Sequence, residues 1–243
     1  MVAAVALTVH IQNVRLATTA FFVALSFAAA VLALRAATVF ASICGFLIAF
    51  ITAITTGVPG FTALTTLFVL TWTSTRLGRE RKQRLGTAEN RRGRQASQVF
   101  ANLGTFALLA AASVLFSHGQ GTLLLAGAAA ALAEAAGDTA SSELGQVFGG
   151  TPYLITGFRR VPPGTDGGVT LAGTIAGCCA AALVLASWAI AAHALPPWMF
   201  APTIAAIAGI LFDSLLGATL ERRGWLNNDG VNFLSTCLLR CWQ

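Results

Sequence analysis

Seven long apolar stretches recur along the sequence, most of them close to the ~20 residues that a helix needs to cross a bilayer. They are Val14–Leu34, Val39–Thr56, Phe61–Thr75, Gln98–Ser117, Thr122–Gly145, Val169–Ala192 and Met199–Leu220. Only 10% of the residues are charged, whereas a soluble domain has about 25% and needs them to face water. We therefore predict an all-α, polytopic transmembrane helix bundle of about seven spans, between roughly six and eight.

One further apolar stretch, Val231–Trp242, is shorter than the others. At about 12 residues it fits a short span, a re-entrant helix or an interfacial helix, and the sequence leaves these open. The second and third stretches, separated by the turn residues 57–60, are expected to pack as a hairpin. Residues 1–243 read as one integral-membrane domain. The small residues Ala128–Ala131 fit a helix contact either within one subunit or in a homodimer.

Basic residues indicate which end of the bundle faces the cytoplasm. Eight of the 15 lysines and arginines lie in one loop, and two basic pairs lie in two later loops. These cytoplasmic loops are residues 76–97, 146–168 and 221–230. With seven spans all three fall on one side, and the positive-inside rule makes that side cytoplasmic, with the N-terminus outside. We expect a multi-pass protein of the cell membrane whose polar site faces the cytoplasm.

The basic run of residues 76–97 also raises nucleic acid as a partner. No interleaved aromatic residues or recognised reader motif accompany it, so we expect no nucleic-acid binding. Topogenic charge and contact with anionic membrane lipid account for the run.

Four acidic residues lie inside apolar stretches or at their ends: Glu134, Asp138, Glu143 and Asp213. A charge at membrane depth costs at least a few kcal/mol unless it faces a cavity or a partner. Glu134 and Asp138 are four residues apart and share a helix face. Asp138 and Asp213 are expected at a similar depth near the cytoplasmic surface, where carboxylates from two helices can hold a divalent cation. The alternative is a hydrogen-bond network that only joins helices.

The loop after Glu143 combines glycine and proline turns with a basic pair. Arg159 and Arg160 suit bidentate binding of phosphate, and backbone N–H groups in a glycine-rich turn converge on anions. The alternative is an ordinary turn-rich connector. We favour a phosphate site in this loop.

A second polar group of residues follows the last long apolar stretch. Ser214 is next to Asp213, and Asn228, Asp229 and Asn232 come after the basic pair of that loop. Amide and carboxylate oxygens of this kind bind Mg²⁺ or nucleotide, although an Asn-Asp-Gly string also forms turns. The sequence contains no Walker loop, and its single lysine, Lys82, stands outside any such motif. If the protein handles nucleotide, its phosphates must therefore be held by arginine, backbone and Mg²⁺.

Three motifs carry a resemblance to a known family. They are GDTASSELG (137–145), RRVPPGTDGGVTLAGTIAG (159–177), and FDSLLGATLERRG with NNDGVNFLST (212–236). In this order and spacing they resemble the integral-membrane family that includes the chloroplast phytyl-phosphate kinase of vitamin E synthesis, and RRGRQASQVFANLG (91–104) does so too. The likeness extends from about residue 35 to residue 236. A looser similarity reaches dolichol kinase and phosphatidate cytidylyltransferase, which implies CTP as donor, although those enzymes commonly carry lysines where this chain has Arg159 and Arg160.

The resemblance implies a kinase that transfers the γ-phosphate of a nucleoside triphosphate, with CTP favoured, to an isoprenoid monophosphate. It implies Mg²⁺ as cofactor and the following site: Asp138, Asp213 and Arg159 as catalytic residues; Asp138, Asp213, Glu143 and Asp229 as metal ligands; and Glu143, Arg160, Thr165, Asp166, Gly167, Gly168, Ser214, Asn228 and Asn232 against substrate or nucleotide. A cytidylyltransferase acting on a lipid phosphate is the first alternative. A lipid or ion transporter that uses the acids as proton or ion ligands is the second.

Overall fold

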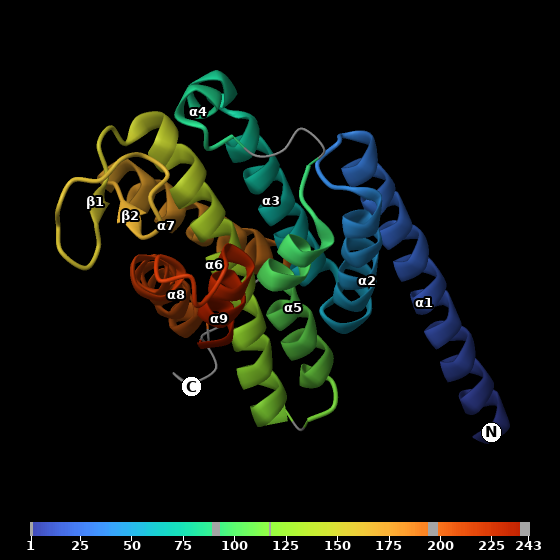
Figure 1. The fold of residues 1–243 in the computed structure, drawn as a ribbon. Helices are drawn as coiled ribbons and strands as arrows, with labels where there is room; N and C mark the ends of the chain where they lie inside the picture. The colour runs from blue at the N-terminus through green and yellow to red at the C-terminus, as the bar shows by residue number, and fades with distance from the viewer. Residues whose placement is uncertain (1, 89–92, 117, 194–198, 239–243) are drawn as a thin grey trace.

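Helices make up nearly all of the regular structure in the computed structural model, which describes residues 2–88, 93–116, 118–193 and 199–238. In chain order the elements are α1 (Val2–Ala33), α2 (Val39–Thr55), α3 (Gly57–Arg76), α4 (Arg79–Leu85), α5 (Ala96–Ser113), α6 (His118–Phe148), β1 (Tyr153–Leu154), β2 (Gly168–Val169), α7 (Leu171–Ala191), α8 (Phe200–Leu216), the π-helical turn η2 (Gly217–Glu221) and α9 (Asn228–Leu238) (Figure 1). The all-α, polytopic bundle is confirmed.

Helix α6 runs through the middle of the bundle and packs against α3, α5, α7 and α8 (Figure 1). Its residues Ala128–Ala131 are completely buried, so they pack within the subunit. Small residues let the backbones approach: a Cβ on Gly177 of α7 would stand 2.8 Å from the carbonyl oxygen of Gly137. Close contact through small residues is a common way for helices to associate inside a membrane, where apolar burial gives little preference.

Each of the seven predicted stretches contains a helix. Five of the described helices are long and apolar enough to cross a membrane: Gln12–Ala33, Ala96–Ser113, Gly119–Phe148, Leu171–Ala191 and Phe200–Glu221. Helix α2 is a shorter apolar helix of 17 residues. It packs against α3 across a turn at Gly57, where φ is +62°, and this is the expected hairpin.

Several boundaries differ from the predicted ones. Helix α3 begins at Gly57 rather than at Phe61 because Pro59 falls in its first turn, where a missing N–H breaks no helical hydrogen bond. The loop 76–97 contains the short helix α4, and the loop 146–168 contains β1 and leads into β2, which pair antiparallel. The loop 221–230 ends early, since α9 begins at Asn228.

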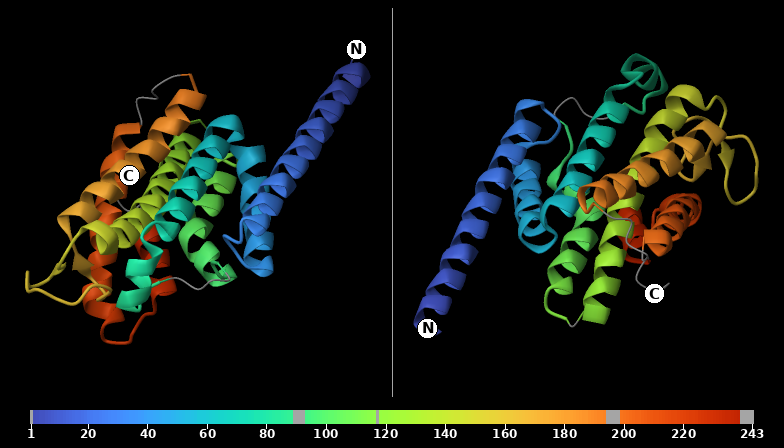
Figure 2. Two further views of the ribbon diagram at one scale, coloured as in Figure 1. Left: turned by 90° about the horizontal axis from the view of Figure 1, so that it is seen from above. Right: turned by 180° about the vertical axis from the view of Figure 1, so that it is seen from behind.

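The three basic loops meet at one end of the bundle, which we call the loop end. A Cβ on Gly78 would touch the side chain of Val147, and one on Gly164 would touch Thr87. Gly167 packs in the same way on Ala218. In Figure 1 α4, β1 and β2 lie at this end and the N-terminus of α1 lies away from it, and Figure 2 shows the same separation from two further sides. Arg91 and Arg92 of the basic run lie outside the described residues.

Candidate functional site

A polar cavity of about 420 Å³ lies at the loop end between α6, α8 and the glycine-rich segment 163–170. We call it the acid cavity, because four carboxylate side chains line it: Asp138, Asp166, Asp213 and Glu221. Eight of the residues predicted from the sequence are in its wall: Asp138, Thr165, Asp166, Gly167, Gly168, Asp213, Ser214 and Asn228. Segments that are far apart in the sequence therefore build one site.

The carboxyl groups of Asp138 on α6 and Asp213 on α8 lie within hydrogen-bonding distance of each other. Two carboxylates this close repel unless a proton or a cation lies between them. Behind them, the Ser235 hydroxyl on α9 lies 2.8 Å from Glu134 Oε1 and 3.2 Å from Asp213 Oδ2. Buried hydroxyl contacts of this kind fix the rotamers of Glu134 and Asp213, so α9 holds the Asp213 member of the carboxylate pair in place.

The paired carboxylates suit Mg²⁺, which prefers oxygen ligands and keeps several of its waters or binds substrate phosphates. Within the described ranges there is no group of three or more His, Cys, Asp or Glu side chains arranged to hold a metal ion. The protein would thus supply Asp138 and Asp213, and the remaining ligands would come from water and phosphate. This division of ligands is typical of magnesium sites that act on nucleotides.

The glycine-rich segment covers the acid cavity by packing on η2. Gly167 has a φ of +70°, and a Cβ there would lie 2.4 Å from the backbone nitrogen of Ala218. Only glycine fits this combination of left-handed backbone and close approach. The π-helical turn brings Glu221, which the sequence analysis did not select, into the cavity wall. Local π-helical turns are frequent at functional sites.

The segment is a weaker anion cradle than the sequence predicts. The backbone N–H of Gly168 donates to the Thr165 carbonyl at 2.9 Å, and the N–H of Thr165 donates to Pro162 at 3.2 Å. Both groups are therefore used within the turn. No Lys or Arg belongs to the described lining of the acid cavity. An anion enters such a cavity most readily together with a cation.

Arg159 and Arg160 are exposed and lie outside the lining of the acid cavity. The Nε of Arg160 donates to the Tyr153 hydroxyl at 3.4 Å, a bond that raises the pKa of the guanidinium. The structure does not bring either arginine to the carboxylate pair. Arg94 lies nearer: it donates to Thr139 on α6 at 3.1 Å and is close enough to attract Asp138.

Glu143 is paired with Lys82 and does not line the acid cavity. Lys82 Nζ lies 2.5 Å from Glu143 Oε2 and also donates to the carbonyl oxygens of Ser74 and Thr75, at 3.0 and 2.7 Å. Only 1% of the Lys82 side chain is exposed. The single lysine among fourteen arginines was the available signal, since a compact ammonium fits three convergent acceptors better than a guanidinium does.

The asparagines at the start of α9 have different roles. Asn227 caps the helix, because its Oδ1 accepts from the Gly230 N–H at 2.9 Å. Asn228 lines the acid cavity, whereas Asp229 does not. Asn232 is buried behind the cavity, and its amide satisfies most partners when the nitrogen donates to Asp213 Oδ2 and the oxygen accepts from Asn102, each at 3.2 Å.

The chain matches one protein family over most of its length. The model of the family described as "Integral membrane protein DUF92" matches residues 22–240. The chain belongs to this family. The match includes every residue that lines the acid cavity. No solved structure matches the chain significantly.

Relatives of this DUF92 protein occur in plants, cyanobacteria and archaea. Protein VTE6, chloroplastic, of Arabidopsis thaliana is 29% identical over 188 residues, which are 75% of this chain and 56% of VTE6. An uncharacterised membrane protein of Synechocystis is 32% identical over 75% of this chain and 71% of its own length. An uncharacterised membrane protein of Methanocaldococcus jannaschii is 37% identical over 71% of this chain and 70% of its own length. The chain thus spans little more than half of VTE6.

Proposed function

We propose that this DUF92 protein is a prenyl-phosphate kinase that transfers the γ-phosphate of a nucleoside triphosphate, with CTP favoured, to an isoprenoid monophosphate. The observation that carries the proposal is the contact of Asp138 and Asp213 in a polar cavity at the loop end of a membrane bundle. The motif resemblance to the family of the phytyl-phosphate kinase, together with the similarity to VTE6, supports the choice of acceptor. We place the protein in the cell membrane with the loop end in the cytoplasm.

The proposed reaction balances without an external base. An oxygen of the acceptor monophosphate forms a bond to the γ-phosphorus, and the bond from that phosphorus to the β–γ bridging oxygen breaks. The electron pair leaves with the nucleoside diphosphate. Because the acceptor is already an anion, the protein needs chiefly to position two phosphates in line and to neutralise their charge.

Each part of the acid cavity has a role in this scheme. Mg²⁺, when bound, would supply charge neutralisation for the triphosphate. Asp138 and Asp213 would hold it, with the hydroxyl of Ser214 and the amide of Asn228 facing the nucleotide. Segment 165–168 would form another part of the wall around the triphosphate. Glu143 is left out because Lys82 already neutralises it. Arg159 and Arg160 are left out because they lie outside the cavity.

Position-specific labelling of the donor tests the proposal. Purified protein in lipid nanodiscs is given geranylgeranyl monophosphate, Mg²⁺ and CTP labelled at either the α- or the γ-phosphate. We expect label on the lipid from γ-labelled CTP alone. Label from α-labelled CTP would instead identify a cytidylyltransferase. Absence of transfer from CTP, ATP, GTP and UTP, with flux of an ion or lipid across the vesicle membrane, would identify a transporter.

A further inference from the structure

A second cavity of about 440 Å³ lies between α1, α2, α3 and α5, on the other side of α6 from α8. Its deeper part is apolar and is lined by Val31, Ile48, Leu67, Phe68 and Leu103. A volume of this size is typical of sites for small organic molecules. Nothing in the proposed reaction so far uses this space. We call it the arginine pocket.

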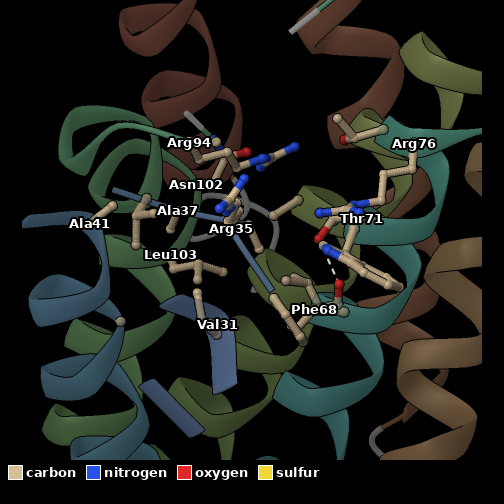
Figure 3. Close-up of a pocket in the computed structure, with 18 of the residues that line it drawn as sticks. Val31, Arg35, Ala37, Ala41, Phe68, Thr71, Arg76, Arg94, Asn102 and Leu103 are labelled. Carbon is tan, nitrogen blue, oxygen red and sulfur yellow. Dashed lines mark hydrogen bonds between the residues drawn. The ribbon is translucent and has the colours of Figure 1, made fainter. Parts of the chain in front are cut away.

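Four arginines line the arginine pocket: Arg35, Arg76, Arg79 and Arg94. Figure 3 shows that Arg35, Arg76 and Arg94 gather towards one end, whereas Val31, Phe68 and Leu103 lie towards the other. Arg76 is held in place, since it donates to the Leu34 carbonyl at 2.6 Å and stacks over Trp72 with its Cζ 4.5 Å from the ring centroid. A pocket that is cationic at one end and apolar at the other matches an amphiphile with an anionic head.

Two hydrogen-bonding side chains in the same pocket lack a partner. Trp72 Nε1 and Thr75 Oγ1 are buried, line the arginine pocket and make no hydrogen bond with any part of the chain that the structure describes. A buried donor without a partner costs about 1–3 kcal/mol, so native structures rarely keep one without a reason. Both groups are donors for oxygen, and they sit on the last turns of α3 between the apolar part and Arg76 and Arg79. A phosphate oxygen would satisfy them.

The arginine pocket and the acid cavity share a wall. Ala135 lines the first and Asp138 lines the second, one turn apart on α6. Arg94 lines the arginine pocket, donates to Thr139 and attracts Asp138. Asn102 also lines the pocket and contacts Asn232, which lies against Asp213. A phosphate at the cationic end would therefore stand next to the carboxylate pair, across Arg94.

We propose that the arginine pocket is the acceptor site and binds a lipid monophosphate with one apolar chain. The phosphate lies among Arg35, Arg79 and Arg94 and accepts from Trp72 Nε1 and Thr75 Oγ1, and the chain lies between α1, α2 and α3. The identification of this lipid as the phosphoryl acceptor rests on the proposed function. The binding site itself does not, because it follows from the shape, charge and unpartnered donors of the pocket.

Removal of the unpartnered donors gives a sharp test. The double variant W72F/T75V deletes the two donor groups. Thr75→Val keeps the size of the side chain, whereas Trp72→Phe keeps an aromatic ring beside Arg76 but is smaller than the indole. If the donors serve no ligand, their loss leaves lipid binding unchanged. We expect instead a folded protein whose affinity for geranylgeranyl monophosphate is lower by about tenfold or more. Thr73→Val is the matched control, since Thr73 lies two residues away and its hydroxyl is already bonded to Val69 and Leu70.

Native mass spectrometry of the full chain in detergent, without nucleotide, measures the binding. Geranylgeranyl monophosphate should bind more tightly than geranylgeraniol, inorganic phosphate or dioleoyl phosphatidic acid. Arg35→Gln and Arg79→Gln should each weaken that preference over the alcohol, whereas Arg84→Gln, on the exposed side of α4, should not. Equal affinities for the alcohol and the monophosphate, tighter binding of phosphatidic acid, or wild-type affinity in W72F/T75V would each overturn the assignment.

The outcome separates the two proposals. Lipid binding as expected without phosphoryl transfer would leave the arginine pocket standing and remove the kinase. The opposite result is phosphoryl transfer with an unchanged KM for the lipid in both W72F/T75V and Arg79→Gln. It would support the kinase and show that the arginine pocket is not its acceptor site.

Discussion

The Ser235 hydroxyl lies 2.8 Å from the Glu134 carboxylate, which is 1% exposed and is held at the centre of the bundle. The same hydroxyl is 3.2 Å from Asp213, so a residue on the last described helix connects the buried acid of α6 with the acid of α8. The short helix α9, with Ser235 and Asn232 on its buried side, is thereby part of the support for the acid cavity.

Replacement of Ser235 by alanine tests that support. The change leaves the buried Glu134 without this hydrogen bond, and we expect the free energy of unfolding to fall by about 1–3 kcal/mol. Thermal denaturation in detergent measures it. Ser187→Ala serves as control because the Ser187 hydroxyl bonds only its own helix, at Val184. Equal effects of the two substitutions would show that Ser235 does no more than fill space.

Removal of one charge from the carboxylate pair should abolish most of the activity. We expect Asp138→Asn and Asp213→Asn each to lower kcat about 100-fold or more, because the charge that neutralises the triphosphate is lost. Activity of the wild type should disappear with EDTA and return with added Mg²⁺. Asp229→Asn, a neighbouring acid outside the cavity, is the control. Wild-type turnover in Asp138→Asn would remove the active-site assignment.

The buried ion pair of Lys82 and Glu143 should matter far more for stability than an exposed pair. Lys82→Met leaves Glu143 without its cation and the carbonyl oxygens of Ser74 and Thr75 without this donor, so we expect a loss of about 3–5 kcal/mol. Arg84→Gln breaks the exposed pair with Glu80, where the expected loss is about 0–1 kcal/mol. Chemical denaturation of both variants compares them. Similar small losses would mean that the Lys82 site is open to water in solution.

Gly167→Ala should disturb the glycine-rich segment through two separate effects. The left-handed backbone costs about 1–2 kcal/mol for alanine, and the new Cβ would also collide with Ala218. Gly224→Ala carries the first effect alone, since its φ is +73° and nothing lies within 4 Å. We expect a clear rise in KM for the nucleotide only in Gly167→Ala. Identical kinetics in the two variants would show that the contact with η2 does not shape the cavity.

The helices and the meeting of the acids were predictable because both follow from local rules. Apolar stretches of spanning length predict helices, and the two spans between successive basic loops bring all three loops to one end. That single topological step was enough to bring Asp138 and Asp213 together before any distance was known. The sequence also predicts that Glu134 and Asp138 point to the same side of their helix, since they are one helical turn apart.

The sequence does not predict contacts that depend on how loops fold back. Glycine and proline turns beside Arg159 and Arg160 indicate a phosphate site, yet the β1–β2 segment carries both arginines away from the acid cavity. The contact of Glu143 with Lys82 joins residues that are 61 positions apart, so no local pattern indicates it. Likewise, Glu221 enters the cavity through a π-helical turn that no simple periodicity predicts.

The burial of Lys82 has a practical consequence for labelling. It is the single lysine of the chain, so an acylating reagent finds no accessible side-chain amine while the loop end stays folded. Modification at Lys82 then requires α4 to detach from α6. The rate of acylation therefore measures how often this local opening occurs. The native sequence already carries this probe, and no amino acid needs to be introduced to use it.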